Sequence, residues 1–120
     1  MTASIHKTAI VAKEAKLGAG IEVGPYSIVE EDVELGDDCL VEAHAIVKRG
    51  TVLGEGCRIG HFAVVGGDPQ CLDFDPVISS GVRVGRGTRI GEGVTIHRSI
   101  KEGESTQVGE NVFLMGYSHV

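Results

Sequence analysis

The 120-residue chain is poor in aromatic residues and in proline. It has no Trp, two Tyr and three Phe, which excludes a core built on large rings and requires one layered from small aliphatic side chains. Only three prolines accompany 18 glycines, and the glycines recur between aliphatic residues, which excludes collagen and low-complexity disorder. At this length we expect a single domain spanning residues 1–120.

Long hydrophobic runs and positive charge are also lacking. The net charge of -6 disfavours binding to nucleic acid or to an anionic membrane. No apolar run is long enough for membrane insertion, and the first residues do not resemble a signal peptide. Three cysteines, an odd number, favour free thiols over disulfides. These features together predict a cytoplasmic protein.

What the chain does have is a repeat with a period of six. Ile, Leu or Val stands at every sixth position from Ile5 to Val65 without a failure, and we call these residues anchors. The residue after an anchor is often glycine, as at Gly18, Gly24 and Gly36. The residue four positions after an anchor is small or aliphatic. This is the hexapeptide pattern.

A period of six fits neither an amphipathic α-helix nor a simple alternating strand, but it suits short strands separated by sharp turns. Three hexapeptides would make one coil of a triangular prism whose coils stack at strand spacing. The sequence therefore predicts an all-β fold, a parallel β-helix with the anchors in ladders inside it. We expect the glycine after each anchor to turn the corner, where a side chain or a restricted φ would interfere.

The repeat is interrupted twice. It breaks after Val65 and returns one residue out of phase at Val84, which predicts a first loop over 67–81. A second loop is predicted over 99–107, where Glu102 replaces an expected anchor. Long loops that leave a rigid solenoid are common places for binding residues. The chain stops in mid-coil on an anchor, Val120, so we expect the β-helix to be truncated at its C-terminal end.

Three segments resemble one family of enzymes. They are Asp68-Pro69-Gln70, Gly93-Val94-Thr95-Ile96-His97-Arg98-Ser99 and Leu114-Met115-Gly116-Tyr117-Ser118-His119-Val120, and they are similar to the UDP-N-acetylglucosamine acyltransferases of lipid A synthesis. The resemblance implies a left-handed β-helix and a homotrimer with active sites between subunits. It further implies that a 3-hydroxyacyl group moves from acyl carrier protein to the sugar 3-hydroxyl of UDP-N-acetylglucosamine.

The resemblance also implies site residues. An alcohol needs a base to accept its proton as it attacks a thioester, and the family uses the second histidine of a His-x-x-His pattern. His119 matches the first histidine and is the catalytic candidate in this chain, while the second would fall beyond Val120. The implied substrate-binding residues are Gln70, Leu72, His97 and Arg98. No metal and no cofactor are expected.

The chain departs from the family pattern in the first loop. The family reads Gln-Asp-Leu-Lys, whereas this chain reads Gln70-Cys71-Leu72-Asp73, so a carboxylate replaces a cation that would meet the sugar nucleotide. A basic cluster later in the chain is expected to dock the acidic carrier protein; its members are Arg83, Arg86, Arg89, Arg98 and Lys101.

Two other functions stay open. Another hexapeptide acyl- or acetyltransferase would use an acyl coenzyme A donor. A non-catalytic β-helix that serves trimerisation would explain Cys71 and Asp73 as lost substrate contacts.

Overall fold

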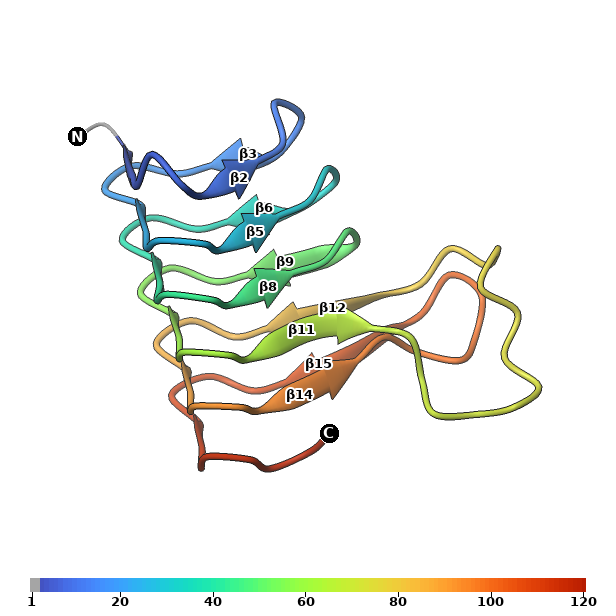
Figure 1. Ribbon diagram of the computed structural model, residues 1–120. Coiled ribbons are helices and arrows are strands. Elements are labelled where there is room, and N and C mark those ends of the chain that lie inside the picture. The colour runs from blue at the N-terminus through green and yellow to red at the C-terminus, as the bar shows by residue number, and fades with distance from the viewer. Residues whose placement is uncertain (1–2) are drawn as a thin grey trace.

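The computed structural model describes residues 3–120, and every strand within this range is short and runs parallel to its neighbours. No helix in the described range has the length and apolar character needed to cross a bilayer. The strands form three sheets that are the three walls of a prism (Figure 1). This is the left-handed parallel β-helix that the hexapeptide repeat and the family resemblance predicted, and the prediction is confirmed.

The chain visits the three walls in turn. Sheet A contains β1 (Ser4–Ile5), β4 (Glu22–Val23), β7 (Leu40–Val41), β10 (Arg58–Ile59), β13 (Arg89–Ile90) and β16 (Phe113–Leu114). Sheet B contains β2 (Ile10–Val11), β5 (Ile28–Val29), β8 (Ile46–Val47), β11 (Val64–Gly67) and β14 (Thr95–His97). Sheet C contains β3 (Lys16–Leu17), β6 (Glu34–Leu35), β9 (Thr51–Leu53), β12 (Gly81–Val84) and β15 (Ser105–Val108).

The core is a set of ladders inside the prism. In sheet A, Val41 pairs with Ile59 and Ile59 with Ile90, and all three side chains are buried. The position four after each anchor also points inward, where Cys39 and Cys57 are fully buried on adjacent coils. A hydrogen bond from the Leu40 N–H to the carbonyl of Cys57 joins these two coils. Burying such aliphatic side chains contributes about 1.5–3 kcal/mol each.

The glycine after an anchor serves close approach between coils. A Cβ built on Gly36 would lie 2.6 Å from the backbone nitrogen of Glu55 on the next coil. The backbone φ is positive at a different position, the third after the anchor, where Tyr26, His44 and Phe62 adopt φ values of 59°, 62° and 63°. Among the glycines that follow an anchor, Gly66 beside the first loop does have a positive φ, of 94°. For the others the expectation of an unusual φ is wrong, because the corner is turned two positions later.

The two loops explain the change of phase. In the first coils, strand partners are separated by three hexapeptides, as for Lys16 and Glu34. Arg58 and Arg89 are partners as well, and the longer segment between them means that the first loop adds two hexapeptides and one extra residue. That single extra residue shifts the repeat by one position. Val82 and Thr106 are partners separated by four hexapeptides, so the second loop adds one hexapeptide and keeps the phase.

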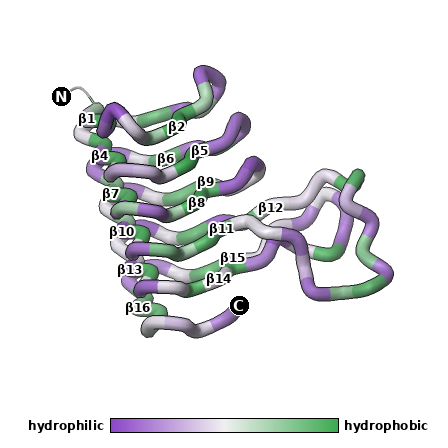
Figure 2. The backbone as a smooth tube through the Cα atoms, viewed as in Figure 1, coloured by the Kyte–Doolittle hydropathy of each residue, from purple (hydrophilic) through white to green (hydrophobic). Residues whose placement is uncertain are grey.

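Both loops leave the prism at the corner between sheets B and C (Figure 1). The first loop comprises residues 68–80, between β11 and β12. The second loop comprises residues 98–104, between β14 and β15. It is shorter than the predicted 99–107, because Ser105, Thr106 and Gln107 pair with β12 as part of β15. In the coils without loops, the tight turns at this corner are strongly hydrophilic (Figure 2).

Candidate active site

The two histidines singled out by the sequence lie together on sheet B. His97 ends β14, and His119 stands on the next coil, where it forms an isolated parallel bridge with Thr95. The imidazole rings of His97 and His119 meet edge to face with their centroids 4.4 Å apart. Nδ1 of His119 lies 2.8 Å from Oγ1 of Thr95, so one ring nitrogen is engaged and Nε2 remains for a substrate.

The surroundings of His97 favour its neutral form. Burial lowers the pKa of His97 below its ordinary value, and the neighbouring His119 lowers it further, while the carboxylate of Asp68 acts in the opposite direction. A neutral imidazole can accept a hydrogen bond through one nitrogen and donate through the other. At neutral pH, His97 is thus suited to bind a polar group of a ligand without carrying a charge.

The first loop carries Gln70 and Leu72, and both side chains are exposed. Leu72 is 106% exposed, so it makes no contribution to the core. Their contact with a substrate remains a prediction. The same part of the loop presents Cys71 and Asp73 to solvent.

Arg98 stands at the base of the first loop with only 7% of its surface exposed. Its guanidinium donates to Oδ1 of Asp68, to the carbonyls of Pro76 and Ile78 and to Oγ of Ser80. These contacts leave about one of its five N–H groups unused. The side chain therefore faces the loop, and a direct contact with substrate remains a prediction.

The basic cluster expected from the sequence is divided by the fold. Arg83 lies on β12 of sheet C and Arg89 on β13 of sheet A, with Arg86 at the corner between them. Arg86 lies near the carboxylates of Glu55 and Glu110. Arg98 cannot contribute to a docking surface, because it is buried beneath the first loop, and on this point the expectation is wrong.

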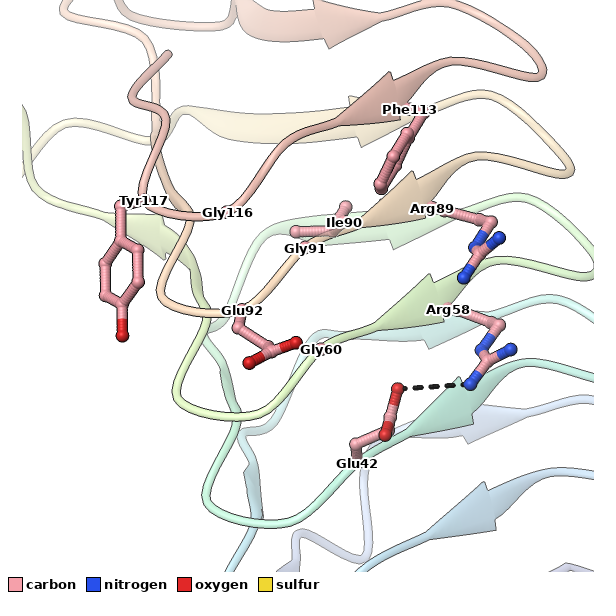
Figure 3. Close-up of a pocket in the computed structure, with 10 residues that line it drawn as sticks. All are labelled: Glu42, Arg58, Gly60, Arg89, Ile90, Gly91, Glu92, Phe113, Gly116 and Tyr117. Carbon is pink, nitrogen blue, oxygen red and sulfur yellow. Dashed lines mark hydrogen bonds and ion pairs between the residues drawn. The ribbon is translucent and has the colours of Figure 1, made fainter.

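A hollow that the sequence did not predict lies on the outer face of sheet A (Figure 3). Arg58, Arg89 and Phe113 lie along it, and the guanidinium of Arg89 packs over the ring of Phe113. Glu42 pairs with Arg58 across 3.3 Å and also with His61. The hollow contains none of the site residues predicted from the sequence. Across residues 3–120, no group of three or more His, Cys, Asp or Glu side chains is placed to hold a metal ion.

Comparison with known proteins agrees with the resemblance seen in the sequence. Residues 32–67 match the family of bacterial transferase hexapeptide proteins (six repeats). The chain is 54% identical over 97% of its length to an acyl-[acyl-carrier-protein]–UDP-N-acetylglucosamine O-acyltransferase of Sulfurihydrogenibium, and 55% identical over 98% to that of Trichlorobacter lovleyi. Over this stretch the chain is a homologue of the UDP-N-acetylglucosamine O-acyltransferases.

Solved structures of this enzyme share the fold. The UDP-N-acetylglucosamine acyltransferase of Bacteroides fragilis superposes with a TM-score of 0.90 at 34% identity, and covers 96% of this chain. That of Campylobacter jejuni superposes with a TM-score of 0.87 at 30% identity, over 98% of this chain. The chain spans 43% and 45% of the length of the Sulfurihydrogenibium and Trichlorobacter enzymes.

Two contacts of the site were missed from the sequence. Thr95 holds the ring of His119, and Asp68 pairs with Arg98 across 3.0 Å. Asp68 was named only for the family resemblance, and it stands 30 residues before Arg98 in the sequence. The register of β11 with β14 brings the two ends together. Only an alignment of these two strands could have revealed the pair from sequence.

Proposed function

We propose that the protein transfers a 3-hydroxyacyl group from acyl carrier protein to the 3-hydroxyl of UDP-N-acetylglucosamine in lipid A biosynthesis. The observation that carries this proposal is the contact of His97 with His119 at the foot of the loop that bears Gln70 and Leu72. The names of the curated relatives support the choice of donor and acceptor.

The reaction is an acyl transfer from sulfur to oxygen. The sugar hydroxyl oxygen forms a bond to the thioester carbonyl carbon, the carbon–sulfur bond breaks, and the hydroxyl proton passes through a histidine base to the departing thiolate. His119 acts next to this base, with Nδ1 held by Thr95 and Nε2 directed to the reacting groups. His97, held neutral by its surroundings, binds a polar group of the acceptor.

The proposal includes a homotrimer that assembles through sheet B. The outward positions of sheet A are mixed, because Glu22, Arg58 and Arg89 stand beside Leu40 and Phe113. The equivalent positions of sheet B, in contrast, are aliphatic in four successive coils: Ile10, Ile28, Ile46 and Val64. Ile10 is 66% exposed in the single chain. The other three are half-buried, and a partly exposed apolar column of this kind is typical of a protein–protein interface.

The corner beside this column is also suited to contact another subunit. The rings of Tyr26 and His44 stack with centroids 5.2 Å apart, and those of His44 and Phe62 with centroids 4.9 Å apart. Because His97 and His119 lie on the same wall, a partner on sheet B would close a cleft over them. In a sedimentation experiment, Ile28→Glu should dissociate the trimer, whereas Val52→Glu at the equivalent position of sheet C should not.

We further propose that the protein works in the cytoplasm. Its three cysteines are all free, as a reducing compartment keeps them. Acyl carrier protein would dock through the exposed arginines Arg83, Arg86 and Arg89, which wrap one corner of the prism.

The function is tested by acyl transfer with the intact gene product. Purified protein is mixed with UDP-N-acetylglucosamine and with 3-hydroxyacyl donors on acyl carrier protein or on coenzyme A in parallel. Transfer from the carrier protein alone supports the proposal. Transfer from coenzyme A alone would favour the other hexapeptide transferases, and trimers without transfer from either donor would favour the scaffold.

A further inference from the structure

Arg98 is unusual because it is buried although it is charged. Among residues 3–120 it is the only buried ionisable side chain other than cysteine. A buried guanidinium is tolerated only when its charge is paired and most of its N–H groups are hydrogen bonded. Here the partners are Asp68 at 3.0 Å, the Pro76 carbonyl at 2.8 Å and the Ile78 carbonyl at 2.7 Å. All of these partners belong to the first loop.

Apart from Arg98, the first loop is held by short backbone turns, in which the Phe74 N–H donates to the Cys71 carbonyl and the Ile78 N–H to the Asp75 carbonyl, and not by a hydrophobic core. Its apolar side chains at Leu72 and Val77 are exposed, so no hydrophobic core forms within it. Phe74 is half-buried, and its ring packs against the guanidinium of Arg98 at 4.8 Å. The same side chain thus contacts both ends of the loop and the ring in its middle.

The second loop attaches to the far end of the first. The carboxylate of Glu102 accepts a hydrogen bond from the Ser79 N–H at 2.8 Å, and the Gly103 N–H donates to the Ser79 carbonyl at 2.7 Å. Glu102 is the residue that interrupts the anchor series. It therefore serves the attachment of the two loops, while Arg98, at the start of the second loop, reaches along the length of the first.

We propose that Arg98 is a positioning residue that fixes the conformation of the first loop, and that it thereby places Gln70 and Leu72 for the acceptor substrate. The second half of this inference rests on the proposed function; the first half does not. An arginine is needed because its planar fork offers donors in several directions at once. A lysine has one ammonium group, which cannot reach Asp68 and both carbonyls together.

The loop conformation is tested by hydrogen–deuterium exchange of the intact protein, without substrate. In Arg98→Lys, peptides covering residues 68–80 should exchange on the order of tenfold faster, the change that follows from the loss of one charge-assisted hydrogen bond. Peptides of β8 and β9 should be unchanged. Arg58→Lys is the matched control, because Arg58 is exposed and pairs only with Glu42. Unchanged exchange over 68–80 in Arg98→Lys would overturn the proposal.

A second variant covers the case in which Arg98→Lys does not fold. Asp68→Asn alters an exposed residue and weakens a single arm of the network, so it should give a smaller acceleration in the same peptides. If exchange in Asp68→Asn matched the wild type while Arg98→Lys was unfolded, Arg98 would be a general stability residue and the proposal would fail.

Kinetics test the link to substrate. Arg98→Lys should raise KM for UDP-N-acetylglucosamine about tenfold with kcat changed less than twofold, because an unfixed loop binds the acceptor less well. A fall in kcat alone would contradict a positioning role. If the wild type transferred no acyl group while the exchange results held, the proposed function would fail and the fixing of the loop by Arg98 would stand.

Discussion

His97 and His119 come from successive coils and meet edge to face, with their ring centroids 4.4 Å apart. Oγ1 of Thr95 is hydrogen bonded to Nδ1 of His119. This arrangement predicts the titration of His97. Burial is the larger cause of its lowered pKa and His119 the second, so His119→Gln should raise the pKa of His97 only part of the way to its ordinary value. NMR titration of the imidazole resonances measures this shift. A His97 pKa unmoved by His119→Gln would show that the two rings do not interact.

The same shift has a consequence for stability. Because the folded pKa lies below the unfolded value, the unfolded chain binds more protons, and stability falls as the pH drops below the ordinary histidine range near 6.5. In His97→Ala, this contribution disappears, so the free energy of unfolding should depend less on pH between about 5 and 7. Urea denaturation at several pH values checks this result.

Removing the His97 side chain should also reduce activity. We expect His97→Ala to lower acyl transfer about ten- to hundredfold, the loss that accompanies one hydrogen bond to a polar or charged substrate group. Trimer stability should change little, because the substitution leaves intact the apolar column of sheet B that we propose as the interface. His6→Ala, at an exposed histidine of the first coil, is the control. Full activity in His97→Ala would remove this residue from the site.

The first loop offers a gain-of-function test. Asp73 stands where the family resemblance places a lysine, and Arg98 cannot replace that cation because its charge already faces Asp68. Asp73→Lys should therefore lower KM for UDP-N-acetylglucosamine by about tenfold, through a charge-assisted hydrogen bond to a substrate oxygen. Glu14→Lys makes the same change of net charge on a distant coil and should have no effect. Equal KM values in all three proteins would argue against a nucleotide contact at residue 73.

A glycine that follows an anchor and a glycine three positions after an anchor should respond differently to the same substitution. Gly36→Asn should destabilise the protein by about 1–3 kcal/mol, because any Cβ there meets the backbone of the next coil. Gly56→Asn should cost no more than about 0.5 kcal/mol, since nothing lies within 4 Å and Asn tolerates its positive φ. Asn111 already adopts a φ of 54° at the equivalent position. Thermal unfolding compares the two, and equal losses would refute the distinction.

The repeat made most of the fold predictable. Anchors such as Val41 and Ile59 mark both the strands and their buried face. This follows because hydrophobic residues recur every six positions and each wall of the prism is also one hexapeptide long. The turn at Tyr26 was not predictable in the same way, because an aromatic residue with positive φ gives no sign of it in the sequence. The end of the second loop was also misplaced, because Ser105, Thr106 and Gln107, which pair with β12 as part of β15, are polar like loop residues.

The site was predictable only where the resemblance reached. His97 and His119 were named from their motifs, and the structure brings them together. The hydrogen-bond partners of Arg98 were not predictable, because Asp68, Pro76 and Ile78 become its neighbours only after the loop folds back. The hexapeptide repeat gives no information about contacts of this kind within a loop.

The extra chain inserted at one corner, in two successive coils and in two different lengths, leaves the ladders of sheets A and C in register. In sheet B the register of β11 with β14 shifts only between Val65 and Gly67, next to the first loop. Loops of two different lengths are thus accommodated at that edge of the prism, which makes it a suitable position for inserting a foreign peptide without changing the packed interior. The residues after the insertion would be renumbered, but the β-helix would keep its shape.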